Sequence, residues 1–217
     1  MKSEPVIIAV DGPAASGKGT LARRLAAHFD FAYLDTGLLY RALAYKVLNR
    51  GEAPEDASAG LRAAQALDIA MLKDPHILVA LRTDAVGTAA SVVAAQPDTR
   101  AAILQIQRDI AKIPPEGKAG AVLDGRDIGT IVCPQATHKV FVTARAEIRA
   151  ERRWQELRLH DPQVSLGDVL TDLKARDQRD SARATAPMRA AQDAHLLDTS
   201  DLSIEEAFAA ALALVSD

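Results

Sequence analysis

Apolar residues recur along this chain with two spacings, and the two spacings predict alternating strands and helices. Short apolar runs followed by polar residues predict strands at residues 6–10, 121–124, 138–142 and 195–198. Apolar residues three or four positions apart predict helices at about 18–29, 38–49, 98–112, 145–158 and 165–177, and the capping box Ser203–Glu206 predicts a last helix. Strands that alternate with helices indicate an α/β fold, with a central parallel sheet flanked by helices on both faces.

The segment from residue 52 to residue 97 has a different pattern, rich in Ala, Asp, Gly and Pro. Its one alternating run, residues 77–81, follows Asp74-Pro75, which predicts a turn and then a strand. We therefore expect an insertion that carries a helix and a small sheet. Upstream of it, Thr36 stands where the N-cap of the second predicted helix is expected.

The first predicted strand leads directly into the sequence Asp-Gly-Pro-Ala-Ala-Ser-Gly-Lys-Gly-Thr at residues 11–20. The spacing G-x-x-x-x-G-K is that of a phosphate-binding P-loop. Gly12 and Gly17 can adopt backbone angles that turn successive N–H groups toward one phosphate, while the next helix and Lys18 add positive charge. Gly19 occupies the position where a Ser or Thr usually holds Mg²⁺, and Thr20 follows it, so the protein ligands of a metal stay undefined.

Composition limits the possible partners. The 217 residues are 48% apolar, enough for one α/β domain with inserted segments, and the formal net charge of −3 does not favour a nucleic acid polymer or an anionic membrane. Nine arginines nevertheless fall between residues 145 and 189, which indicates either a compact polyanion such as a nucleotide or a solvated, salt-bridged helix face. Cys133 is the single cysteine, which fits a reducing cytoplasm, and no signal peptide or membrane-spanning run is evident.

Three further groups of polar residues suggest chemistry. Arg41 lies five residues after Thr36, so both side chains can face one ligand at the start of a helix. Residues 124–130, Asp-Gly-Arg-Asp-Ile-Gly-Thr, follow a strand, and ligands of open α/β sheets lie beyond the carboxyl ends of strands. Residues 176–183 repeat Arg and Asp at helical spacing, either as ion pairs or as a mobile arginine flap. Together they favour phosphoryl transfer, which needs aligned reactants, positive charge and exclusion of water.

In this order the motifs resemble those of the bacterial cytidylate kinase family, a branch of the P-loop nucleoside monophosphate kinases, over nearly the whole chain. The resemblance implies transfer of the γ-phosphoryl group of ATP to CMP or dCMP with Mg²⁺, in pyrimidine nucleotide metabolism. It also implies one domain over residues 1–217. Its expected parts are a P-loop kinase core (1–51, 98–157 and 190–217), an insert that binds the nucleoside monophosphate (about 52–97) and an arginine lid (about 158–189).

The resemblance also assigns residues to roles. ATP binding is assigned to Gly12, Pro13, Ala14, Ala15, Ser16, Gly17, Lys18, Gly19, Thr20, Arg149 and Arg153. CMP binding is assigned to Thr36, Arg41, Ser91, Arg100, Arg126, Asp127, Arg176 and Asp180. Catalytic stabilisation of the transferred group is assigned to Lys18, Arg126, Arg179 and Arg183. Between Leu81 and Ser91 the chain is several residues shorter than the family pattern.

Alternatives remain open at this point. A regulatory GTPase would normally carry an Asn-Lys-x-Asp motif, but the single asparagine is Asn49 and Arg50 follows it. A P-loop protein without catalysis would leave the three arginine-bearing groups unexplained. The residues alone also allow another acceptor, such as UMP, AMP, shikimate or dephospho-coenzyme A. Ser91, Arg100 and Asp127 favour cytosine among the bases, and the family is usually monomeric.

Overall fold

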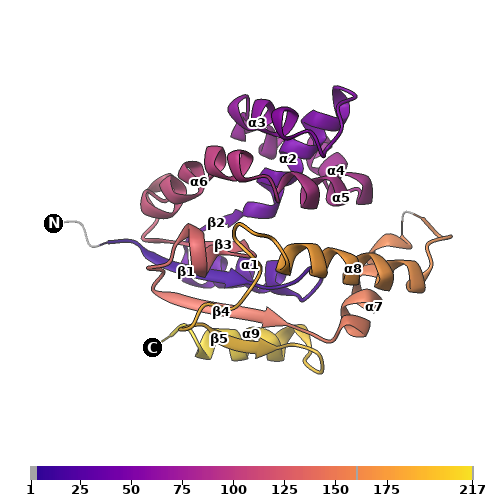
Figure 1. Ribbon diagram of the computed structural model, residues 1–217. Coiled ribbons are helices and arrows are strands. Elements are labelled where there is room, and N and C mark those ends of the chain that lie inside the picture. The colour runs from indigo at the N-terminus through magenta and orange to yellow at the C-terminus, as the bar shows by residue number, and fades with distance from the viewer. Residues whose placement is uncertain (1–3, 160, 217) are drawn as a thin grey trace. The chain divides into compact units, whose positions relative to one another are not determined.

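The computed structural model describes residues 4–159 and 161–216, which include a five-stranded sheet (Figure 1). The strand order is β2-β3-β1-β4-β5. The strands are β1 (Val6–Asp11), β2 (Ala32–Asp35), β3 (Gly120–Gly125), β4 (His138–Thr143) and β5 (His195–Asp198). β1 runs parallel to both β3 and β4, and β4 runs parallel to β5. The predicted α/β fold with a parallel sheet flanked by helices is therefore confirmed.

The described chain forms two compact units. Residues 4–34 and 110–216 form the first unit, and residues 35–109 form the second. Besides the strands, the first unit contains α1 (Lys18–Phe29), η2 (Pro115–Gly117), η3 (Ile128–Val132), α7 (Ala146–Leu157), α8 (Leu166–Ser181) and α9 (Ile204–Ala213). The second contains α2 (Thr36–Asn49), α3 (Ala57–Gln65), η1 (Ile69–Lys73), α4 (Pro75–Leu81), α5 (Asp84–Val93) and α6 (Pro97–Lys112) up to residue 109.

The core of the first unit explains why its predicted strands form. The strands bury Ile8, Val10 and Val122 against Leu21 and Leu25 of α1, and α9 adds small apolar side chains to the same cluster. Each fully buried Leu or Ile contributes about 2 kcal/mol relative to an exposed one. The predicted stripe of α1 and the capping box at Ser203 are both confirmed. This core holds the carboxyl ends of β1 and β3 next to the start of α1.

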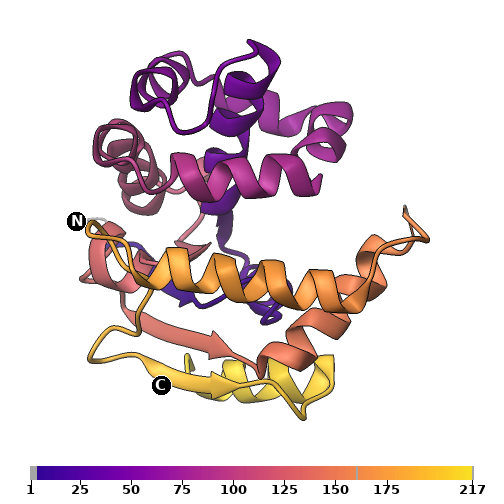
Figure 2. The same ribbon diagram turned by 45° about the vertical axis from the view of Figure 1, so that its right-hand side comes forward.

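The helices α7 and α8 form a second apolar cluster in the first unit. Ala150 of α7 packs with Val169 and Leu173 of α8, and Ala14 of the loop after β1 joins them. α8 continues without a break to Ser181 rather than ending near residue 177 (Figure 2). As a result, Asp180 lies on the same regular helix as Arg176 and not in a loop beyond it.

The second unit is helical throughout, and this corrects two predictions. Residues 77–81 belong to α4 and not to a strand, and no strand occurs in residues 52–97, all of which the structure describes. Asp74 caps α4 by accepting a hydrogen bond from the N–H of His76, and Pro75 occupies the first turn, where proline favours a helix. The N-cap of α2 is Asp35, whose Oδ1 accepts from the N–H of Leu38, while Thr36 is the first helical residue.

The helices α4 and α5 are short and apolar, and both belong to the core of the second unit. Within the described residues, no single helix is long and apolar enough to cross a membrane. α4 and α5 reach the required length and apolarity only as a pair, and they bend by 74° where they meet. Leu81 of α4 and Val86 and Val93 of α5 pack into the helical core of the second unit with Leu39 and Leu43 of α2.

Candidate functional site

The loop between β1 and α1 has a backbone that only particular residues can adopt. Gly12 has a φ of 144°, and a Cβ on it would lie 2.0 Å from the carbonyl oxygen of Val142 in β4. Gly17 has a φ of 87° and leads directly into α1. The N–H groups at the start of α1 have no partners within the helix, so this end favours an anion such as phosphate. The loop therefore combines close packing on β4 with a position at the N-terminal end of α1.

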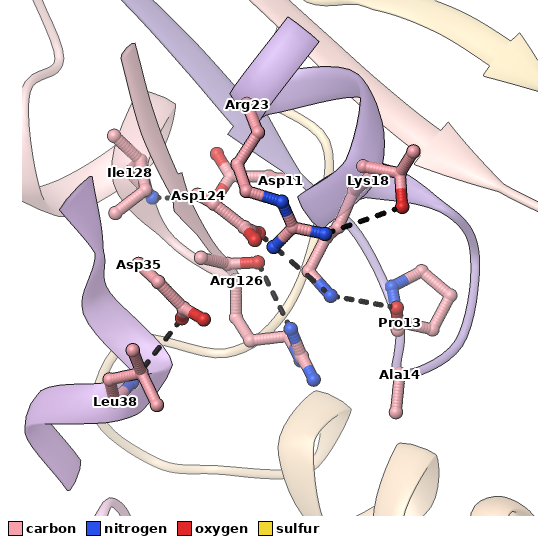
Figure 3. A network of polar contacts seen from close by, with 12 residues as sticks. Asp11, Pro13, Ala14, Lys18, Arg23, Asp35, Leu38, Asp124, Arg126 and Ile128 are labelled. Atoms are coloured by element: carbon pink, nitrogen blue, oxygen red, sulfur yellow. Dashed lines mark hydrogen bonds and ion pairs between the residues drawn. The ribbon is translucent and has the colours of Figure 1, made fainter. Parts of the chain in front are cut away.

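Lys18 supplies a positive charge to this loop from the first turn of α1 (Figure 3). Its side chain is 10% exposed, and its Nζ donates to the carbonyl oxygen of Pro13 at 3.1 Å. The same Nζ lies 3.9 Å from Oδ1 of Asp124 in β3. A Cβ on Gly19 would lie 2.9 Å from Oδ2 of Asp124. The absence of a side chain at residue 19 thus lets a carboxylate approach the loop closely.

A second carboxylate, Asp11, is buried at the carboxyl end of β1. Its two oxygens accept hydrogen bonds from the N–H groups of Ile128 and Gly129, each at 2.8 Å. Burial raises the pKa of Asp11 to about 7, the two amide donors oppose that increase, and the nearby charges of Asp127 and Asp124 add to it. Asp11 therefore fixes η3 to the end of β1. Since η3 is a turn of π-helix directly after Asp127, this contact positions the Arg126-Asp127 segment.

Asp180 of α8 lies at the centre of the arginine cluster. It is 1% exposed, and its Oδ2 accepts from Nε of Arg126 at 3.2 Å. Its Oδ1 pairs with Arg183, and Oδ2 lies 4.0 Å from Nε of Arg176. Burial opposes ionisation of this carboxyl, but the charges of Arg126, Arg183 and Arg176 outweigh it and lower the pKa of Asp180. The structure thus gathers three of the predicted arginines around the carboxylate of a fourth predicted residue, Asp180.

The two arginines assigned to ATP from α7 differ in their surroundings. Arg149 is buried, and its Nη1 donates to the carbonyl oxygen of Ala14 in the loop at 3.2 Å. Its Nη2 lies 2.7 Å from Oδ2 of Asp177 in α8, so this side chain joins the loop to both helices. Arg153 is half-buried and donates to Glu156 at 3.0 Å, and Arg179 is exposed on α8. The side chain of Arg149 therefore contacts the loop through the backbone carbonyl group of Ala14.

The remaining predicted residues lie in the second unit. Thr36 is buried at the start of α2, and Ser91 is buried in α5. Arg100 of α6 is buried, donates to the carbonyl oxygen of Ala94 at 3.0 Å, and lies 5.3 Å from the ring centroid of Tyr40. Arg41 of α2 donates to two backbone carbonyl groups of the α4–α5 segment. Buried polar side chains are uncommon in a small helical unit, so Thr36, Ser91 and Arg100 stay candidates for a binding role.

Asp11 and Asp124 have no predicted role, although the sequence carries a signal for both. Each is an acidic residue directly after an apolar strand run, and β1 pairs with β3 so that Val10 lies opposite Asp124. Parallel pairing brings the carboxyl ends of neighbouring strands to one edge of the sheet. Two acids at the ends of two adjacent strands could therefore have been predicted to share the edge where the P-loop starts.

The described residues contain no group of three or more metal-binding side chains. Magnesium bound to a nucleotide usually takes one or two protein carboxylates and completes its shell with phosphate oxygens and water. Asp124, a carboxylate close to Lys18 and to the loop, has the right chemistry for such a ligand. The donor set therefore fits a metal that arrives with a nucleotide.

Comparisons with known proteins agree with this geometry. The model of the family described as "Cytidylate kinase" matches residues 8–217. A cytidylate kinase of Rhodospirillum rubrum is 58% identical over 211 residues, which is 97% of each chain, and one of Azorhizobium caulinodans is 57% identical over 97% of this chain and 98% of its own. Among solved structures, an uncharacterized protein from Eubacterium ventriosum shares the fold, with a TM-score of 0.53, 13% identity, and coverage of 98% and 99% of the two chains. The chain belongs to the cytidylate kinase family.

Proposed function

We propose that this protein transfers the γ-phosphoryl group of ATP to CMP or dCMP, with ADP and CDP or dCDP as products. The observation that carries the proposal is the combination, in one compact unit, of a P-loop containing Lys18 and a cluster of arginines around Asp180. Such a combination suits phosphoryl transfer because the reaction depends on positive charge and alignment and needs no protein nucleophile. Membership of the cytidylate kinase family selects CMP among the possible acceptors.

On the donor side, we propose that residues 12–20 hold the ATP phosphates. In this proposal, the backbone N–H groups of the loop and the start of α1 bind the phosphate chain. Lys18, in the first turn of α1, bridges toward the γ-phosphate. Arg149 supports this function by holding the carbonyl group of Ala14, which fixes the path of the loop. We propose that Arg153 contributes charge near the same nucleotide.

On the acceptor side, the proposal keeps the assignments implied by the family resemblance. Arg41 and Arg126 bind the CMP phosphate, with Thr36 beside it, and Arg176 and Asp180 bind the sugar. The cytosine base is assigned to Ser91, Arg100 and Asp127. A carboxylate and a guanidinium can together read the donor and acceptor pattern of one base edge, so Asp127 is given a role in recognition and not in proton abstraction.

We propose that Lys18, Arg126, Arg179 and Arg183 stabilise the transferred group. Planar guanidinium groups can hold two phosphate oxygens at once, and donors that are fixed before reaction cost little reorganisation during it. Residues 158–189 serve as a lid that excludes water, so that ATP is not hydrolysed. Mg²⁺ bound with ATP would neutralise phosphate charge, and Asp124 is the residue that would hold it.

A coupled ADP-release assay with Mg²⁺–ATP and a panel of CMP, dCMP, UMP, AMP and GMP tests the proposal. We expect rapid turnover with CMP and dCMP and little with the other three. Comparable turnover with UMP would retain the phosphate-binding residues and reject the cytosine assignments. Absence of turnover that depends on an acceptor would reject the kinase proposal as a whole.

The proposal also includes the oligomeric state, the metabolic role and the cellular location of the enzyme. We propose a monomer that acts in pyrimidine nucleotide metabolism in the cytoplasm, with a nucleotide-monophosphate insert at about residues 52–97. Size-exclusion chromatography with light scattering tests the monomer. A mass near 23.1 kDa supports it, and a mass near twice that value contradicts it.

A further inference from the structure

The guanidinium group of Arg41 is held by backbone groups of the segment that joins α4 to α5. Its Nη1 donates to the carbonyl oxygen of Leu81 at 2.7 Å and to that of Thr83 at 3.3 Å. Leu81 is the last residue of α4, and the last carbonyl groups of a helix have no partners within it. They also carry partial negative charge, which favours a cation. Two acceptors thus restrain one end of a long, otherwise flexible side chain.

The other side of this guanidinium meets α5 at Gly87. Gly87 is a buried residue in the interior of the helix, where glycine is less favourable than alanine by about 1 kcal/mol. A Cβ built on it would lie 2.9 Å from Nη2, 3.1 Å from Nη1 and 3.3 Å from Cζ of Arg41. All three distances are shorter than ordinary van der Waals contact. The space that a side chain would need at residue 87 is therefore occupied by the head group of Arg41.

We propose that Gly87 is a positioning residue for the acceptor site: its missing side chain leaves the space in which the Leu81 and Thr83 carbonyl groups hold Arg41 in one orientation. The inference rests on the proposed function, in which Arg41 binds the CMP phosphate. A methyl group at residue 87 would displace the guanidinium, because that group is the movable end of a flexible side chain while α5 is packed in the core. The helix would keep its place and the arginine would lose its orientation.

Gly87→Ala tests this inference, because stability and function are expected to change in opposite directions. The variant should unfold at an equal or higher temperature than the wild type, since alanine favours the helix. Its KM for CMP should rise by roughly tenfold, because a displacement of less than an ångström can misalign a phosphate ligand, whereas its Kd for ATP should not change. Isothermal titration calorimetry with CMP should show the same weakening in binding alone.

Thr88→Ala is the matched control, since it also increases helix propensity in α5 at an exposed position. It should leave the KM for CMP unchanged. Arg41→Ala tests separately whether Arg41 binds the acceptor. In a protein that already carries Arg41→Ala, adding Gly87→Ala should not change the KM for CMP further. If Arg41→Ala raises the KM for CMP and Gly87→Ala does not, the inference is overturned while the acceptor role of Arg41 stands. If neither substitution changes it, Arg41 does not bind the acceptor and both claims fail.

Discussion

Replacing Asp11 with Asn should remove a pH dependence of stability that the structure builds into the end of β1. Both carboxylate oxygens of Asp11 accept backbone N–H groups, from Ile128 and Gly129. Burial is the largest influence on this group and raises its pKa from 3.8 to about 7. Between these two values the folded protein holds a proton that the unfolded chain has released. The stability therefore falls as the pH rises through this window, the reverse of the usual behaviour of an aspartate.

The size of the effect follows from the shift. Each unit of pKa difference corresponds to about 1.4 kcal/mol, so the free energy of unfolding should fall by about 2 to 3 kcal/mol between about pH 5 and about pH 8 through this group alone. Asn cannot ionise, so Asp11→Asn should lack this contribution. Asn also offers one acceptor oxygen in place of two, and the amide that loses its partner costs about 1 to 3 kcal/mol. The variant should be less stable than the wild type at about pH 5. The difference between their free energies of unfolding, called the stability gap below, should narrow toward about pH 8.

Urea denaturation followed by circular dichroism at several pH values measures this stability gap directly. Asp172→Asn, at an exposed position of α8, is the control for the loss of one formal charge. A stability gap for Asp11→Asn that stays constant across the range would refute the reasoning, because the buried carboxyl would then be ionised in both states. The same variant should also weaken discrimination between CMP and UMP, since η3 fixes the segment that contains Asp127.

Other substitutions test the remaining parts of the site. Lys18→Ala should abolish turnover in steady-state assays, because the charge that stabilises the transferred group is lost; residual activity within tenfold of the wild type would contradict this role. Arg126→Ala should raise the KM for CMP and leave ATP binding near normal by calorimetry, and unchanged kinetics would remove Arg126 from the acceptor site. Asp127→Ala should lower the ratio of CMP to UMP turnover, and an unaltered ratio would show that Asp127 does not read the base. Gly12→Ala should destabilise the protein by more than about 2 kcal/mol in urea, because its φ of 144° and the carbonyl group of Val142 exclude a methyl group; equal stability would disprove that packing argument.

The sequence predicted the sheet and its phosphate-binding loop well because both depend on short-range patterns. A central strand of a parallel sheet is buried on both faces, so β1, β3 and β4 occur as short apolar runs. The P-loop motif is contiguous, and its glycines lie where the backbone requires them. The pattern failed in α4, where a run of five consecutive apolar residues, 77–81, fits a strand and a helix equally well. There the local signal of Asp74-Pro75 decided the outcome, as an N-cap followed by a first-turn proline.

The start of α2 shows a related limit. Asp35 and Thr36 are both good N-cap residues, and their order alone does not say which side chain caps the helix. The tertiary structure decides, because β2 continues to Asp35 and the helix begins at the next residue. Contacts between residues that are distant in the chain could not be predicted from local sequence patterns, for a different reason. Asp11 meets Ile128 only because β1 and β3 are neighbours in the sheet, and no local pattern encodes that pairing.

The Asp180 cluster shows how such long-range contacts change the meaning of a motif. Helical spacing alone predicted pairs worth a few tenths of a kcal/mol each, but Arg126 comes from the end of β3 and converts the pairs into a buried network. Three arginines around one ionised carboxylate leave a formal charge of +3 − 1 = +2. A phosphate monoester carries a charge of about −2 near neutral pH. In the proposed function, Arg126 and Arg183 would face such a charge, while Asp180 limits the repulsion among the arginines before a nucleotide binds. Asp180 therefore stabilises the folded protein through these ion pairs and, in the proposed function, sets the net charge that the cluster offers to a nucleotide.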